Sequence, residues 1–152
     1  MVASSVLVPA DWATQGGIVW NVQPQCGGSG YNIDFHATSP DGRAGLHFLP
    51  MDHWQWNSMG TAAMPGCRHE RIMTVRQYLE GFVQQNRPYA RILDYRPRPD
   101  IAEPMQQLNR VTPMPMGQSR SWVEAGEVLI GYSQAGVEMR EIIAAAAIFN
   151  LM

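Results

Sequence analysis

Hydrophobic and polar residues alternate strictly over residues 31–38, where Tyr, Ile, Phe and Ala take every second position between Asn, Asp, His and Thr. This period of two predicts a half-buried β-strand. The stretch "SPDG" at 39–42 follows, in which Pro presets one turn dihedral and Gly accepts a positive φ. The alternation resumes over residues 44–48, so the whole stretch predicts a β-hairpin.

The pairing register of this hairpin decides what its two histidines face. If Thr38 pairs with Arg43, His47 lies opposite Asp34, whereas a shift of two residues places His47 opposite His36. A three-residue loop would pair apolar with polar positions and is disfavoured, because a slip of one residue exchanges the two faces. Both remaining registers keep the histidines on the polar face, and the sequence leaves the choice between them open.

The rest of the first half predicts few elements. A short strand, a Pro turn and a second strand at 18–22 open the chain, with Gly16 and Gly17 expected to interrupt them. A long loop rich in Gly, Pro and Met covers residues 50–70. Loops of this length are usually functional or mobile.

The second half begins with the clearest helix, predicted over residues 75–86. Thr74 and Gln77 form a capping-box pattern, and the apolar residues follow a helical stripe. A strand is expected at 89–95, and a second, shorter helix at 101–110 begins from a capping signal of Asp100 and Glu103.

The C-terminal part predicts a loop, "TPMPMGQ", and then a long hairpin that turns at "QAG". Apolar residues occupy both faces of its strands near 128–130 and 142–148, which is typical of central strands covered on both sides. The chain stops at "FNLM" directly after an apolar strand, and we therefore expect the natural protein to continue beyond residue 152.

The sum of these elements is about six or seven mostly antiparallel strands with two helices. We predict an α+β fold, an antiparallel β-sheet with helices packed on it, and a single domain over residues 1–152. A chain of 152 residues can bury a full hydrophobic core.

Charge and hydropathy argue against a nucleic-acid-binding protein and against a membrane-spanning protein. The net charge is −2, and all eleven positive charges are scattered arginines, without the basic stripe of a nucleic-acid binder. No apolar run approaches the roughly 20 residues of a membrane span. The start "MVASSV" has no basic and apolar leader pattern, although a chain whose leader has been removed would look the same.

Two cysteines, Cys26 and Cys67, lie in loop contexts. One disulfide, and hence export, is the interpretation we prefer, and two free thiols are the alternative.

Candidate chemistry is sparse. The spacings HExxH, CxxC and HxH are absent, as are nucleophile elbows and nucleotide-binding loops. We therefore predict no metal site, no cofactor and no catalytic residues. The alternative is a metal-dependent hydrolase that uses His36, His47 and His53.

The aromatic segment "DHWQW" predicts a binding surface formed by Met51, His53, Trp54 and Trp56. Two tryptophans two residues apart face the same way in an extended segment, which suits a carbohydrate or protein surface. A carbohydrate-binding module is thus a further alternative. In the contrary interpretation, both rings fill the edge of the core.

The stretches "VPADW", "GGIVWNV" and "YNIDFHATSPDGRAGLHFLP" resemble bacterial proteins of unknown function with a Mog1/PsbP-like domain. The matching positions are Pro9, Trp12, Gly16, Gly17, Trp20, Pro40, Asp41, Gly42 and Pro50. The resemblance implies a three-layer α/β/α sandwich, a binding or assembly role without catalytic residues, and export in bacteria.

We therefore expect a non-enzymatic binding or accessory domain of the bacterial cell envelope, periplasmic or extracellular. Its partner would be a protein or a small ligand, and a second copy of the chain is a further candidate.

Overall fold

The computed structural model describes the chain in four segments and two single residues, namely 6–20, 26, 28, 30–56, 66–115 and 117–151. The chain separates into two compact units, Met1–Arg71 and Ile72–Met152, and each unit is considered by itself. The extent of a single domain over residues 1–152 stays a prediction.

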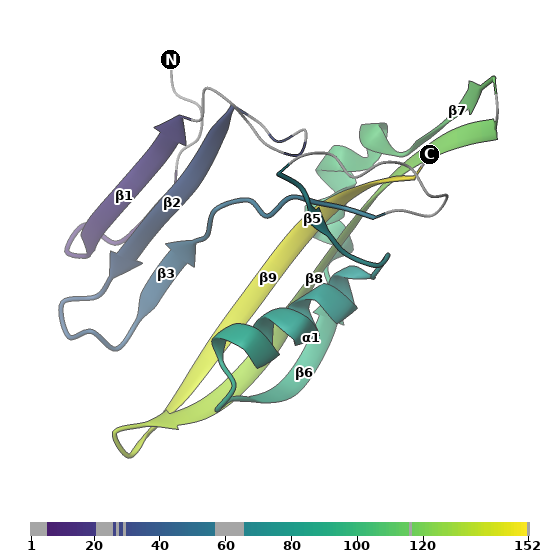
Figure 1. Cartoon of the computed structure of the whole chain (residues 1–152). Coiled ribbons are helices and arrows are strands. Elements are labelled where there is room, and N and C mark those ends of the chain that lie inside the picture. Colours follow the sequence, from purple (N-terminus) through teal and green to yellow (C-terminus); the bar gives the residue numbers. More distant parts are fainter. Residues whose placement is uncertain are drawn as a thin grey trace. The chain divides into compact units, whose positions relative to one another are not determined.

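The first unit contains a three-stranded antiparallel sheet of β1 (Ala13–Trp20), β2 (Tyr31–Thr38) and β3 (Gly45–Phe48), shown in purple and blue in Figure 1. The predicted hairpin is confirmed, and its register is the one that places His36 opposite His47. Between the strands, Gly42 donates its N–H to the carbonyl of Ser39 and has a φ of 68°. The turn chemistry of "SPDG" is therefore as expected.

The expected interruption at Gly16 and Gly17 is wrong, because β1 runs through both residues. Gly16 pairs with Phe35 and has a φ of 96°. A side chain at Gly16 would overlap the backbone carbonyl of Asp34. The glycine thus allows a close approach of two strands instead of ending one of them.

A small second sheet completes the described part of the first unit. The two-residue strands β4 (Trp54–Gln55) and β5 (Arg68–His69) pair in parallel. The predicted disulfide is confirmed, since Cys26 and Cys67 are bonded and their Cα atoms lie 4.8 Å apart.

The second unit begins with helix α1 (Val75–Asn86), which confirms the predicted helix at both ends. The side chain of Thr74 accepts a hydrogen bond from the backbone N–H of Gln77, and Gln77 returns one to the backbone of Thr74. The apolar stripe is also confirmed, because α1 buries Val75, Leu79 and Val83.

The second unit also contains a four-stranded antiparallel sheet, in which the long strand β8 (Gly117–Gln134) pairs with three others. These are β6 (Arg91–Pro97), β7 (Arg110–Met114) and β9 (Val137–Leu151). The long hairpin turns at Ala135 and Gly136, which have φ values of 50° and 78°, as in the two-residue turns that match strand twist.

Two predictions between β6 and β8 are wrong. The expected loop "TPMPMGQ" overlaps β7 over residues 112–114, and Pro113 is tolerated there because β7 pairs only with β8 among the described residues. The helix expected over 101–110 is instead α2 (Pro99–Ala102) followed by the 3₁₀-helix η1 (Glu103–Leu108). Asp100 is bound by the side chain of Arg98 and does not cap the helix.

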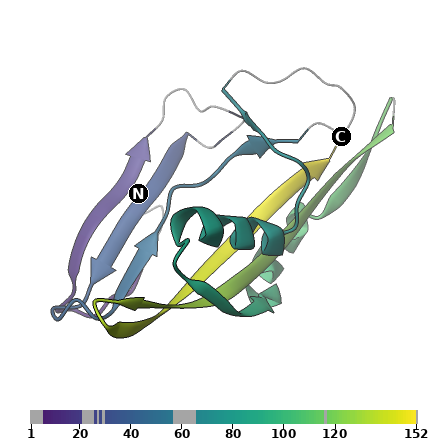
Figure 2. The same ribbon diagram turned by 60° about the horizontal axis from the view of Figure 1, so that its bottom comes forward.

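Helix α1 covers one face of this sheet. It lies across β8 and β9 in both Figure 1 and Figure 2. Val128 and Ile130 of β8 are fully buried, and they alternate with residues that face the other way. On that other face Ile142 and Ile148 of β9 are 64% and 53% exposed, so the expected cover on both sides is wrong for β9.

The α+β class is confirmed as a mixed fold of helices and mostly antiparallel sheets, of which only the small sheet of β4 and β5 is parallel among the described residues. The described residues hold nine strands in three sheets, whereas six or seven strands were expected in one. The Mog1/PsbP-like sandwich stays a prediction. Among the described residues, no helix combines the length and the apolar character needed to cross a membrane.

Candidate functional site

Asp34, His36 and His47 gather on the polar face of the sheet of β1, β2 and β3. Asp34 and His36 lie two residues apart on β2 and share a face because side chains alternate along a strand. The register then adds His47 of β3 directly opposite His36. The diagonal neighbour of His47 on β2 is Asp34, which long side chains can reach.

Asp34 and His47 are in contact, and His36 lies close to His47. Nε2 of His47 lies 2.9 Å from Oδ1 of Asp34, and the rings of His36 and His47 are 5.6 Å apart between centroids. One ligand atom from each of the three residues lies within 4.8 Å of the others. About half of the His47 and Asp34 side-chain surfaces remains exposed.

The neighbouring strand β1 leaves room beside this cluster. Gly17 pairs with Asp34, and Gln15 pairs with His36. The position that a Cβ atom would take at Gly17 has no atom within 4 Å. The cluster is therefore open on the β1 side, next to the carboxylate.

His53, the third histidine of the predicted hydrolase site, does not belong to this cluster. Asp34 takes its place. Asp34 lies directly opposite His47 in only one of the two registers that the sequence allows, and in that register His36 and His47 are not opposite each other. In the structure, His47 lies directly opposite His36 and also contacts Asp34, its diagonal neighbour on β2.

The predicted binding surface lies on the segment after β3. Its residue Met51 donates its backbone N–H to the side chain of Asn32 at 3.0 Å. Trp54 and Trp56 are half-buried, and the guanidinium of Arg68 lies 6.0 Å from the centroid of the Trp54 ring. This guanidinium also pairs with Asp52 at 2.9 Å.

The Arg68 guanidinium thus lies at the outer limit of a cation–π contact with the Trp54 ring. Residues 57–65 of the same loop lie outside the described residues. The binding role of Met51, His53, Trp54 and Trp56 stays a prediction.

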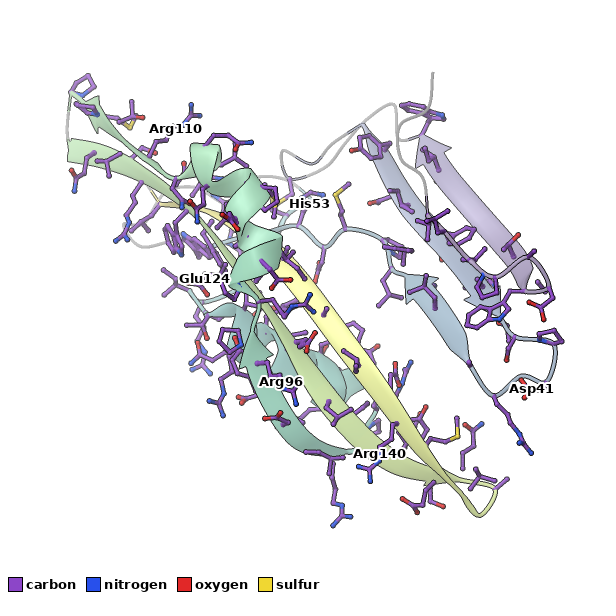
Figure 3. The ribbon with its side chains drawn as sticks, turned by 180° about the vertical axis from the view of Figure 1, so that it is seen from behind. Asp41, His53, Arg96, Arg110, Glu124 and Arg140 are labelled. Atoms are coloured by element: carbon purple, nitrogen blue, oxygen red, sulfur yellow. A yellow bond between two sulfur atoms is a disulfide. The ribbon has the colours of Figure 1, made fainter. Side chains whose placement is uncertain are left out.

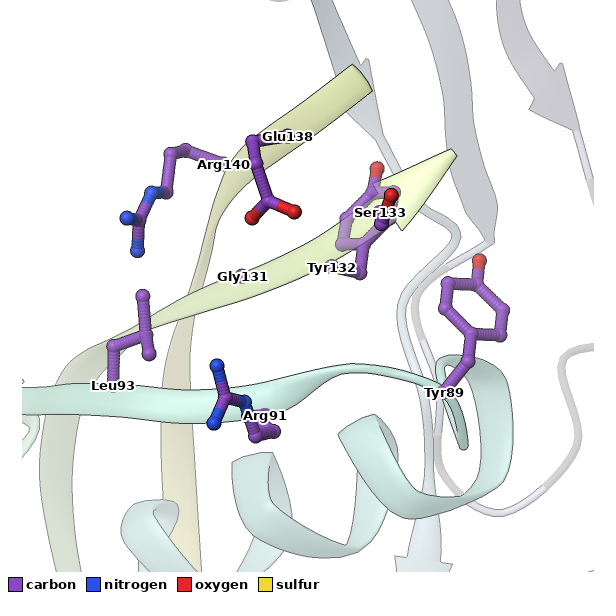
Figure 4. A pocket seen from close by; sticks show the side chains of 8 residues that line it. All are labelled: Tyr89, Arg91, Leu93, Gly131, Tyr132, Ser133, Glu138 and Arg140. Atoms are coloured by element: carbon purple, nitrogen blue, oxygen red, sulfur yellow. The ribbon is translucent and has the colours of Figure 1, made fainter. Parts of the chain in front are cut away.

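Among the described residues of the second unit, shallow cavities lie over the sheet, and two of them are considered in turn. The larger, of about 330 Å³, is shown in Figure 4 and has Arg91 of β6 and Arg140 of β9 on either side of Gly131. Glu138 also lines it, so the cavity carries charges of both signs. The smaller, of about 220 Å³, includes Glu127 and the exposed Ile142.

Ion pairs attach the helical segments to this sheet. The side chain of Arg87, after α1, binds Glu141 of β9 through two hydrogen bonds of 3.1 and 3.2 Å, which raise the pKa of the Arg87 guanidinium. The side chain of Arg98 binds Asp100 and also Glu127 of β8. These hydrogen bonds raise the pKa of the Arg98 guanidinium, and the bond to Asp100 has the larger effect. Both arrangements are structural supports for the fold.

No protein-family model, no curated protein and no solved structure matches this chain. The resemblance to Mog1/PsbP-like proteins therefore stays a prediction from the sequence.

Proposed function

We propose that this chain is a non-enzymatic binding or accessory domain, exported to the bacterial cell envelope, that docks an extended segment of a partner protein. The disulfide between Cys26 and Cys67 supports the export part of this proposal, because disulfides persist in oxidising compartments.

The observation that carries the proposal is the outer edge of β9. Within the described residues, β9 pairs with β8 along its whole length and with no other strand. The edge therefore offers a row of backbone donors and acceptors over residues 137–151. Such edges are templates for strand addition unless charges, prolines or bulges protect them.

The sequence of β9 favours an apolar partner strand. Residues 142–149, "IIAAAAIF", contain no charge and no proline. The exposed Ile142 and Ile148 lie on either side of four alanines, where they can pack against apolar side chains of an added strand. This length accommodates a partner segment of about eight residues, or roughly 26 Å of strand.

Site-specific photo-crosslinking in the bacterial envelope tests this proposal. A photoreactive residue at position 142 or 148 is expected to form adducts with one partner protein. The matched control is Val111 on β7 of the same unit, which is 57% exposed and belongs to a strand outside the proposed contact. The variant Ala146→Lys places a charge on the exposed face of β9 and is expected to abolish the adducts without unfolding the chain.

The captured partner is then purified, and amide hydrogen exchange is measured in the complex. Slower exchange of β9 amides supports strand addition. Adducts that form equally from position 111, or that survive Ala146→Lys, overturn the proposal. Adducts between two copies of the chain would also overturn it in favour of a homo-oligomer.

A further inference from the structure

We propose that Asp34, His36 and His47 bind one divalent transition-metal ion of the zinc, nickel or copper class. Within the part of the chain that the structure describes, they are the one group of three His, Cys, Asp or Glu side chains close enough to share an ion. The site lies in the first unit, so it is independent of the β9 edge.

The donor set fits this class of ion. Imidazole nitrogens suit zinc, copper and nickel, and a carboxylate oxygen is a common third ligand. The first-half sequence was expected to hold no metal site because no local ligand spacing was present. Here one ligand comes from a different strand, and only the hairpin register brings it to the other two.

The distances allow closure around an ion. Ligand bonds of about 2.0–2.2 Å to a tetrahedral ion separate neighbouring ligand atoms by about 3.4 Å. The three ligand atoms already lie within 4.8 Å of one another, and one pair is at 2.9 Å. The remaining difference is small for half-exposed side chains that can change rotamer.

The surroundings leave a coordination position open. Gly17, paired with Asp34, contributes no side chain, and nothing lies within 4 Å of its missing Cβ. Water or a ligand atom from a partner can complete the coordination from that side. No thiolate competes for the ion, because both cysteines are in the disulfide.

A simpler interpretation is that Asp34 and His47 form only a hydrogen-bonded pair. That interpretation explains the 2.9 Å separation of Asp34 and His47, but it assigns no function to His36. The two interpretations therefore differ in the effect of replacing His36.

The test uses the whole disulfide-bonded chain, freed of metal with a chelator and titrated with Zn²⁺ by calorimetry. We expect one ion per chain, and affinity at least about tenfold weaker in His36→Gln, His47→Gln and Asp34→Asn, because even supporting residues of metal sites contribute that much. The matched controls His53→Gln and His69→Gln replace histidines outside the cluster and are expected to bind as the unmodified chain does.

A second readout uses Cu²⁺ and electron paramagnetic resonance, which detects bound imidazole nitrogens directly in the unmodified chain. Coupling to two nitrogens that falls to one in His36→Gln supports the site. Equal Zn²⁺ binding by the unmodified chain and His36→Gln overturns it, as does loss of binding in His53→Gln. If His36→Gln fails to fold, absence of nitrogen coupling in the unmodified chain still overturns the proposal.

Discussion

Glu124 of β8 accepts a hydrogen bond from the backbone N–H of Val75, the first residue of α1, at 3.1 Å. Its other carboxylate oxygen accepts one from the indole N–H of Trp122 at 3.0 Å. The carboxylate thus satisfies one of the free N–H groups at the start of α1 and places a negative charge at the positive end of the helix. It links the helix to the sheet over 49 residues of sequence. Figure 3 labels Glu124 on β8.

Replacing Glu124 with Ala is expected to lower the free energy of unfolding by about 1.5–3 kcal/mol, the range for hydrogen bonds to a charged group. Urea denaturation followed by circular dichroism measures this change. The control is Glu80→Ala, which removes an exposed pair with Arg76 in the same helix and should change stability by about 0.5 kcal/mol or less. Equal effects of the two variants would contradict a specific role for Glu124.

Gly16→Ala is expected to destabilise the first unit by about 2 kcal/mol or more. The new methyl group would meet the carbonyl of Asp34, and a φ of 96° is unfavourable for alanine. Gly81→Ala in α1 is the opposite case, because nothing lies within 4 Å of its Cβ position and alanine is the better helix former. It should stabilise the protein by about 0.5–1 kcal/mol. A stability gain in Gly16→Ala, measured by urea denaturation, would refute the close approach of β1 and β2.

Removal of the disulfide by the double change of Cys26 and Cys67 to Ser is expected to cost about 3–4 kcal/mol, since the bond closes a loop over 41 residues. Amide hydrogen exchange should show the loss in β1 and β2, where protection falls. The unmodified chain in reductant is the control and should behave like the double variant. Unchanged protection in both samples would mean that the bond contributes nothing to the first unit.

The elements that were predictable are those with local signals. The helix at 75–86 has its own capping box and apolar stripe, and both ends were confirmed. The hairpin was also predictable, but its register was not, because shifting a strand by two residues preserves the alternation. The register depends on which side chains pair across the strands, such as Phe35 with Phe48. The alternation within one strand carries no information about this pairing.

The errors arose where tertiary context overrides a local signal. Gly16 and Gly17 signal a break, but here they permit close strand packing. Strand β7 was missed because Pro113 is a loop signal that an edge strand tolerates. Apolar residues on both faces of β9 predicted a central strand, yet β9 lies at an edge among the described residues, with Ile142 exposed. Edge position is a property of the assembled sheet and has no signature in one strand.

The turn between β2 and β3 makes a pH-dependent prediction. Asp41 lies at the tip of this turn (Figure 3), where the hydroxyl of Ser39 donates to Oδ1 of its carboxylate at 2.6 Å and the backbone N–H of Arg43 at 3.1 Å. These two hydrogen bonds hold the pKa of Asp41 below its usual value of 3.8, and the bond from Ser39 has the larger effect. Because the pKa is lower in the folded chain, the ionised carboxylate stabilises the turn above about pH 4, and this contribution is lost as pH falls through the folded value.

Ser39→Ala removes the largest cause, so the pKa of Asp41 should rise towards 3.8. Carbon-detected NMR titration of the Asp41 carboxylate measures the shift. Ser133→Ala, at an exposed position in the second unit, is the matched control and should leave the titration of Asp41 unchanged. In parallel, the stability difference between the unmodified chain and Asp41→Asn should shrink below pH 4. A pKa of Asp41 that is the same with and without the Ser39 hydroxyl would mean that the turn is held by its backbone bonds alone.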